Sequence, residues 1–214
     1  MGKSLLGLRN IRIGSNRGRD VPSPLGTEKK HFDFYGTTWG FSDKKASREL
    51  NIGSIKPYER ILPGMIWGCA REPEHRADVQ LHKDESNEDA LFLNFQAPHS
   101  RFLTLEFDLD HTALANGGVV SLMLEASAVP TTSCRAAVRF STPDVERGFH
   151  DAPLRKFVFT SNAAPITISG FVDPVLDNKR LPVTRAKLIL FMSKRELTLA
   201  IRRISISPAP IAAR

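Results

Sequence analysis

Four aromatic residues have side chains suited to stacking on a planar ligand: Tyr35, Trp39, Tyr58 and Trp67. The chain contains no other Tyr or Trp. Such rings stack on sugars and on nucleic acid bases, and they also fill hydrophobic pockets on partner subunits. We therefore expect these four residues to bind a ligand or to form an interface. Packing against the chain's own core is a third alternative, and the sequence leaves it open.

A second candidate binding element is the basic segment at residues 1–30. It holds seven basic and two acidic residues, so it carries +5 of the chain's net charge of +7. We expect Arg9, Arg12, Arg17 and Arg19 to make its contacts, with phosphate, an anionic polymer or an acidic neighbouring subunit. Nothing in the segment would distinguish one base from another, so we expect no specific nucleic acid partner. A solvated tail is the alternative.

The sequence carries no signature of catalysis. Nucleophile elbows, phosphate loops and metalloprotease helices are all missing from it. Two polar clusters could hold a metal ion, the first at His75, His82, Asp84 and Glu85 and the second at Asp108, Asp110 and His111. The first matches no standard ligand spacing, and the second is more typical of a solvated strand end than of a calcium site. We therefore expect no enzymatic activity, no metal and no cofactor.

Composition is that of a folded globular chain. Of its 214 residues, 41% are apolar and 25% are charged, which fits one domain, or one domain with a large extension. Cys69 and Cys134 form no metal or redox motif and are expected to be free thiols, with a single disulfide as the alternative. No apolar stretch is long enough for a signal peptide or a membrane span. We expect synthesis in the cytoplasm.

Short alternating apolar segments dominate the chain from Leu91 onward. In the clearest of them, apolar Leu103, Leu105 and Phe107 alternate with Thr104, Glu106 and Asp108. This pattern predicts a half-buried strand whose polar residues face solvent. Near the C-terminus the apolar phase shifts at Arg202 and Arg203, which predicts either a β-bulge or two strands that meet at a bend. About seven to nine such segments predict an all-β antiparallel sandwich.

Glycine is distributed unevenly along the chain, since ten of its 14 glycines lie in the first 70 residues. We expect a basic, Gly- and Pro-rich extended arm over residues 1–76, a β-sandwich domain over residues 77–209 and a tail over residues 210–214. A short helix is expected between Ser42 or Asp43, either of which can cap it, and Gly53. Residues 52–76 are expected to be loop.

The stretch from Phe102 to Pro208 resembles jelly-roll carbohydrate-binding modules of the galactose-binding-like type. Three features match: the strand Phe102–Asp110, the apolar run Lys187–Met192 and the terminal segment Leu197–Ser207. The resemblance implies a sandwich whose loops or concave face bind sugar. Jelly rolls also build virus capsids, spikes and fibres, often with basic N-terminal arms.

Our leading functional hypothesis is a non-catalytic structural protein of a larger, virion-like particle. Its partners would be protein subunits of a homo- or hetero-oligomeric assembly, and its surface would present a polysaccharide-binding site. This hypothesis leads because the sandwich region, residues 77–209, has no Trp or Tyr to stack on a sugar ring. The alternatives are a stand-alone carbohydrate-binding module and an enzyme with an unrecognised site.

Overall fold

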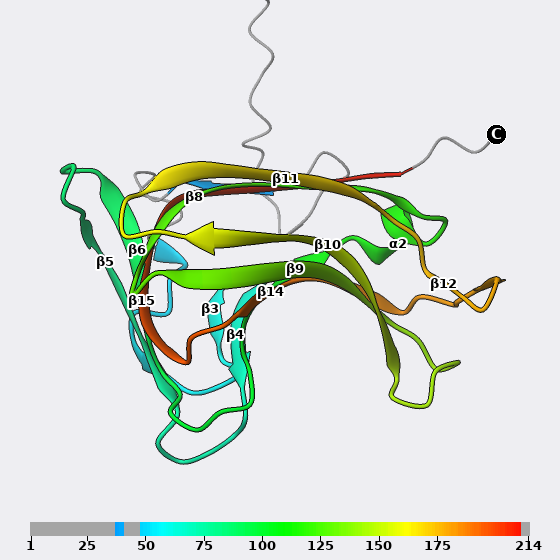
Figure 1. Ribbon diagram of the computed structural model, residues 1–214, viewed down its shortest axis with the longest axis horizontal. Helices are drawn as coiled ribbons and strands as arrows, with labels where there is room; N and C mark the ends of the chain where they lie inside the picture. Colours follow the sequence, from blue (N-terminus) through cyan, green and yellow to red (C-terminus); the bar gives the residue numbers. More distant parts are fainter. Residues whose placement is uncertain (1–36, 41–47, 211–214) are drawn as a thin grey trace, which may run out of the picture.

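Alternating apolar residues build two antiparallel sheets that stack face to face, which confirms the predicted jelly-roll β-sandwich (Figure 1). The computed structural model describes residues 37–40 and 48–210, with only the backbone described for residues 37–40. The expected contacts of Arg9, Arg12, Arg17 and Arg19, and the position of Tyr35, lie outside the described residues, as does most of the expected helix before Gly53.

Sheet A has seven strands. Its order is β11 (Ala164–Val172), β8 (Gly118–Val129), β15 (Glu196–Pro210), β6 (Asp89–Gln96), β5 (Arg76–Lys83) and β2 (Gly53–Ile55), and β1 (Thr37–Gly40) also pairs with β15.

Sheet B has six strands. Its order is β10 (Phe149–Phe159), β9 (Thr132–Ser141), β14 (Arg185–Met192), β7 (Leu103–Leu109), β4 (Met65–Cys69) and β3 (Arg60–Leu62). Two smaller elements complete the described chain. Helix α2 (His111–Leu114) begins after Asp110, whose carboxylate accepts a hydrogen bond from the Thr112 amide, and a hairpin joins β12 (Val175–Leu176) to β13 (Lys179–Arg180). Within the described chain, no helix has the length and apolar character needed to cross a membrane.

The core lies between the two sheets and follows the predicted alternation. Leu103, Leu105 and Phe107 are 0% exposed, as expected for the inward face of β7. Cys69 and Cys134 are buried free thiols, which confirms the prediction of unpaired cysteines. Burial raises the pKa of the Cys69 thiol to about 11, so this group stays neutral.

The phase shift near the C-terminus is a β-bulge within one continuous strand. The register of β15 against β8 shifts between Ile201 and Arg203, while pairing continues from Thr198 to Pro210. Before the bulge β15 pairs with β6, and after it with β1. Of the two predicted alternatives, the bulge is therefore confirmed and the bend between two strands is wrong.

The expected boundary between arm and sandwich, at residues 76 and 77, is wrong. Strands β2, β3 and β4 lie before it, and they pair with β5 and β7 inside the two sheets. They are only three to five residues long, and the turn at Pro63 and Gly64 interrupts them, so alternation was too short to detect. Residues 52–76 are therefore part of the sandwich rather than a loop.

Trp67 belongs to the core and not to a binding surface. It lies on β4 with 0% exposure, and its ring is 5.7 Å from that of Phe95 on the opposite sheet. Of the three alternatives for Trp67, packing against the chain's own core is the one that the structure shows, because alternation along β4 turns its side chain inward. Trp39 lies on β1, beside β15 of sheet A.

Candidate functional site

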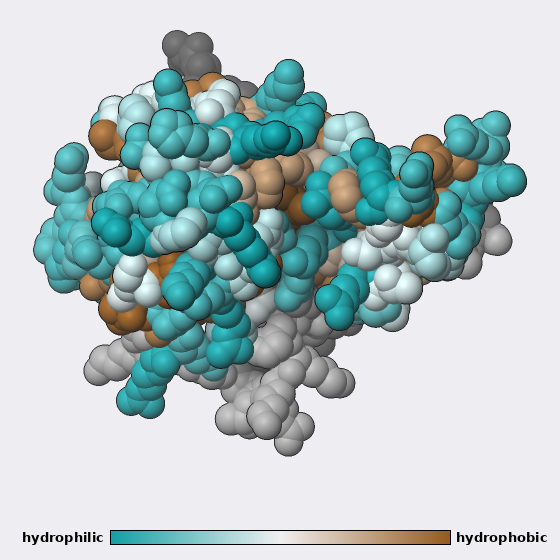
Figure 2. Space-filling model, turned by 90° about the horizontal axis from the view of Figure 1, so that it is seen from below, coloured by the Kyte–Doolittle hydropathy of each residue, from teal (hydrophilic) through white to brown (hydrophobic). Residues whose placement is uncertain are grey.

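The outer face of sheet B is concave and carries the candidate site. In Figure 1 the sheet arches, with the β9–β10 turn at one side and β3 and β4 at the other. Figure 2 looks at this side of the molecule, where hydrophilic side chains surround hydrophobic atoms in a hollow. The side chains that point out of the sheet here form what we call the concave face.

Strand register places the residues of the concave face in three rows across the sheet. The first row is Gly68, Thr104, Phe191, Arg135 and Lys156; the second is Ile66, Glu106, Ile189, Ala137 and Pro153; the third is Asp108, Lys187, Arg139 and Asp151. In the second row, Ile189 and Ala137 are 1% and 4% exposed although they face away from the core, so they form the floor.

Thr104 and Glu106 correct the sequence prediction for β7. They lie on the outer face as expected, but they are 2% and 8% exposed rather than solvated. The sheet curves around them, and the Glu106 carboxylate has two partners. It accepts a hydrogen bond from Thr104 Oγ1 at 3.1 Å and pairs with Lys187 Nζ at 2.9 Å. Alternation predicts which face of the sheet a side chain lies on, but it does not predict how far that side chain is shielded from solvent.

A second ion pair crosses the third row. Arg139 donates from Nε to one Asp151 oxygen at 2.7 Å and from a terminal nitrogen to the other at 2.9 Å. The hydrogen bonds to Asp151 raise the pKa of Arg139 above its ordinary value despite partial burial. Bidentate geometry of this kind holds both side chains in one orientation. The middle of the concave face is therefore rigid, and its charges are neutralised in pairs.

Tyr58 reaches the concave face from the turn before β3. Its amide donates to the Trp67 carbonyl at 2.9 Å, and its φ of 68° is rare for a residue with a side chain. The ring lies over Gly68, since a Cβ built on this glycine would be 3.0 Å from Tyr58 Cε1. Tyr58 is 37% exposed, and its pKa is raised, first by burial and then by the charge of Glu106.

Two phenylalanines extend the aromatic surface. The guanidinium of Arg135 lies 4.8 Å from the centre of the Phe191 ring, and that of Arg139 lies 3.9 Å from the centre of the Phe149 ring. Gly68, beneath Tyr58, and Phe191 occupy the same row two strands apart, which corresponds to roughly 10 Å. The concave face thus presents two partly exposed rings spaced along one direction.

The loop at residues 97–102 forms the rim beside the first row, and side-chain hydrogen bonds fix its position. His75 Nδ1 is 2.6 Å from the Ala70 carbonyl and Nε2 is 2.7 Å from the Pro98 carbonyl. Arg195 donates to the carbonyls of Ser100 and Arg101. Residues 97–102 are therefore held on two sides.

The pH dependence of stability should report on His75. Carbonyl oxygens only accept hydrogen bonds, so both ring nitrogens must donate, which requires the protonated form. Burial alone would lower the pKa of His75, but the two carbonyls, with Glu74 and Glu72, outweigh it and raise the pKa above 6.5. A raised pKa stabilises the fold below the unfolded value, and this stabilisation is lost as pH rises through the folded value.

We therefore expect the free energy of unfolding of the wild type to fall between about pH 5.5 and about pH 8.5. In His75→Asn this fall should be smaller, because the titrating group is gone. Urea denaturation of both proteins at the two pH values measures the difference. Parallel pH profiles for the two proteins would contradict the assignment of a protonated His75.

Of the four aromatic residues predicted as a ligand or interface set, Tyr58 is the one that the described chain brings to the concave face. Sequence reasoning missed the other members of the site, which are Phe149, Phe191, Glu106, Lys187, Arg135, Arg139 and Asp151. They come from four different strands, so no local spacing unites them. The signal that could have found them is the polar phase of each predicted strand, opposite the core phase.

The geometry of the carboxylates bears on the chemistry available here. Glu106 on β7 and Asp151 on β10 are three strands apart, roughly 14 Å at ordinary strand spacing. Asp108 lies two residues along β7 from Glu106 on the same face, roughly 7 Å away. Glycoside hydrolysis by two carboxylates needs a separation of about 5–9.5 Å. Glu106 and Asp151 are each ion-paired. Within the described residues, no three His, Cys, Asp or Glu side chains converge as metal ligands.

Carbohydrate-binding modules are among the solved structures similar to this chain. The CBM22-1 xylan-binding domain of Paenibacillus barcinonensis Xyn10C matches with a TM-score of 0.46 and 11% identity, over 74% of this chain and 94% of that chain. A family 11 module from Clostridium thermocellum, in complex with a beta-1,3-1,4-mixed-linked tetrasaccharide, matches with a TM-score of 0.43 and 10% identity, over 75% and 99%. No protein-family model matches the chain, and no curated protein matches it in sequence.

Proposed function

We propose that this protein is a non-catalytic carbohydrate-binding module and that the concave face of sheet B is its glycan site. The observation that carries this proposal is the Tyr58 ring, which is 37% exposed and packs over Gly68 in the row that also contains Phe191. Tyr and Phe rings offer apolar faces to the C–H groups of sugars, and a tyrosine adds a hydroxyl that can hydrogen-bond.

The polar surroundings of the rings suit a sugar chain. Ion-paired Glu106, Lys187, Arg139 and Asp151 keep hydrogen-bonding capacity toward the open side of the face while their charges are balanced. A carboxylate accepts from hydroxyls, and guanidinium and ammonium groups donate to them. Because these side chains are already held, little conformational entropy is lost when a ligand binds. The ion pairs of Glu106 with Lys187 and of Asp151 with Arg139 support binding over hydrolysis.

Gly68→Ala tests this proposal. The new methyl group would lie 2.7 Å from Thr104 Oγ1, 2.9 Å from Glu106 Oε1 and 3.0 Å from Tyr58 Cε1, closer than such atoms normally approach. We expect the Tyr58 ring and Glu106 to shift, and retardation in gels that contain soluble polysaccharide to fall sharply. Affinity electrophoresis against a panel of neutral and charged polysaccharides measures this retardation.

Gly170→Ala is the matched control. It lies on β11 of the other sheet, and its Cβ would meet the terminal methyl group of Leu154 at 2.7 Å, so binding should be retained. Equal retardation of the wild type and Gly68→Ala on every polysaccharide that retards the wild type would count against the concave face as the site.

A second candidate function is the assembly role inferred from the sequence. The observation in its favour is an exposed apolar group on the outer face of sheet A, where Phe171 is 56% exposed and pairs with Val119, which is 40% exposed. Exposed apolar clusters often mark contacts between proteins. Its other part, the basic segment at residues 1–30, lies outside the described residues. The oligomeric and virion-like context therefore stays a prediction, and so does the cytoplasmic location.

A further inference from the structure

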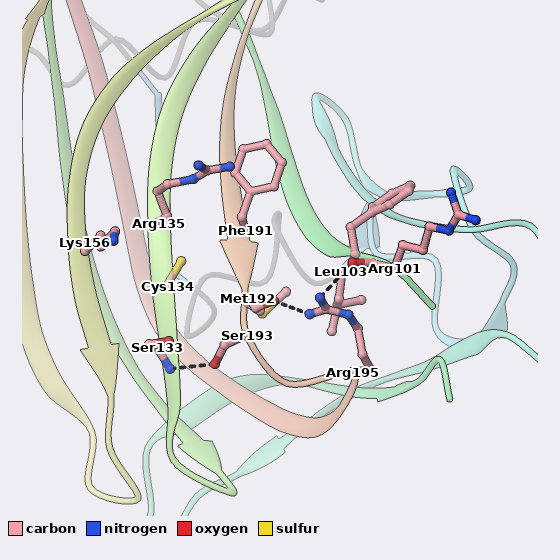
Figure 3. Close-up of a pocket in the computed structure, with 11 residues that line it drawn as sticks. Arg101, Leu103, Ser133, Cys134, Arg135, Lys156, Phe191, Met192, Ser193 and Arg195 are labelled. Atoms are coloured by element: carbon pink, nitrogen blue, oxygen red, sulfur yellow. Dashed lines mark hydrogen bonds between the residues drawn. The ribbon is translucent and has the colours of Figure 1, made fainter. Parts of the chain in front are cut away.

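A pocket of about 500 Å³ opens at one end of the concave face, where β9 begins, β14 ends and β7 begins (Figure 3). Its lining is strongly cationic. Among the residues that form it, Arg101, Arg135, Lys156 and Arg195 are basic and none is acidic. Phe191 belongs both to this pocket and to the first row of the concave face, so the pocket continues the glycan site proposed above.

The basic residues differ in whether their charged groups already have hydrogen-bond partners within the protein. Arg195 is structural, because its guanidinium donates to the carbonyls of Ser100, Met192 and Arg101 and so braces the rim. In Figure 3 the Arg101 side chain points away from Arg135 and Lys156. Arg135 lies beside the Phe191 ring, and Lys156 is its register partner on β10. Both Arg135 and Lys156 are exposed.

Ion pairing separates this end of the face from its middle. Arg139 and Lys187 are neutralised by Asp151 and Glu106. Among the described residues, no carboxylate pairs with Arg135 or Lys156. A pocket with four cations, of which Arg195 is held by backbone carbonyls, and with an aromatic wall attracts a compact anion. The hydroxyl of Ser193 at the base, held by the Ser133 amide, adds a polar group.

We propose that this pocket binds an anionic substituent, a carboxylate or a sulfate, of the glycan whose backbone lies along the concave face. The ligand is then an acidic polysaccharide. This inference rests on the proposed function, because the pocket serves as one end of the same site. Arg135 and Lys156 make the charge contacts, Tyr58 and Phe191 contact the sugar rings, and the paired residues in the middle bind hydroxyls.

Matched ligands test the charge requirement. An oligogalacturonate of defined length is compared with its methyl ester, which has the same backbone without the charge, and dextran sulfate is compared with dextran. Isothermal titration calorimetry should show at least one acidic ligand binding about tenfold or more tightly than its neutral counterpart, on the scale of one hydrogen bond between charged groups. The pair that shows the difference identifies carboxylate or sulfate. Added salt should reduce the difference, because it screens exposed charges.

The double variant Arg135→Gln with Lys156→Gln should remove this preference, so that the acidic and neutral ligands bind with about equal affinity. Its control is Lys179→Gln with Arg203→Gln, which removes the same charge from exposed positions on β13 and β15. Equal affinity for acidic and neutral ligands would overturn the proposal. So would equal losses in the two double variants, since that outcome means unspecific attraction.

Tyr58→Ala separates a failure of this inference from a failure of the proposed function. Tyr58→Ala could weaken the binding of acidic and neutral ligands alike while the double glutamine variant changes neither affinity. That result would support the glycan site and contradict the anionic pocket. If no glycan binds, or if Tyr58→Ala changes no affinity while the glutamine variant does, the concave face is not a glycan site.

Discussion

Trp67→Ala should lower the free energy of unfolding by about 3–5 kcal/mol, the usual cost of truncating a large buried aromatic side chain. Trp67 is the largest of the fully buried side chains and contacts Phe95 across the sandwich, so it joins sheet B to sheet A. A cavity left there cannot be filled from either sheet without backbone movement. Urea denaturation followed by circular dichroism measures the loss.

Comparison with Trp67→Phe separates the effect of the lost side-chain volume from that of the buried N–H group. Trp67 Nε1 is buried without a hydrogen-bond partner in the described structure, and such a group costs about 1–3 kcal/mol to bury. Phenylalanine keeps most of the apolar volume and removes this N–H, so it should cost roughly half as much as alanine or less. Phe171→Ala, at an exposed aromatic, should change stability by about 0.5 kcal/mol or less. Similar small losses at both sites would mean that Trp67 does not join the sheets.

Tyr58→Ala should weaken binding of the preferred glycan by about tenfold or more while changing stability little. An aromatic contact contributes about 0.5–1.5 kcal/mol beyond the area it buries, and about 1.4 kcal/mol corresponds to a factor of ten. The ring packs on the surface of Gly68 rather than in the core, so its removal leaves the sandwich intact. Calorimetric titration measures the affinity.

Tyr58→Phe should bind nearly as well as the wild type, since it keeps the ring and loses only the hydroxyl. Phe171→Ala removes an exposed ring from the opposite sheet and should leave the affinity unchanged. If Tyr58→Ala binds like the wild type, or if Phe171→Ala shows the larger loss, the concave face does not provide the stacking platform.

Alternation was enough to predict the sandwich, because each long strand has one face in the core. Leu103, Leu105 and Phe107 are fully buried on β7, and the phase shift at Arg202 is the bulge that lets β15 pair with β6 and then with β1. These patterns extend over seven or more residues. Patterns of this length depend on the facing of side chains within one strand, so they can be recognised without knowing the tertiary structure.

The site could not be predicted in the same way, because its residues meet only through strand order. Arg135 and Phe191 are neighbours because β9 and β14 pair in sheet B. Tyr58 and Trp67 lie nine positions apart and have similar rings, yet one is on the concave face and the other in the core. Their different environments depend on the short strands β3 and β4 and on the positive φ at Tyr58.

Mapping of the bound ligand by NMR tests the central claim most directly. Amide chemical shifts of the labelled full chain are followed during titration with the oligosaccharide that binds best. The account predicts that the largest changes gather at the concave face, at Gly68, Thr104, Ala137, Ile189 and Phe191, on four adjacent strands of sheet B. Changes confined to the outer face of sheet A, around Val119, Met123 and Phe171, would contradict it.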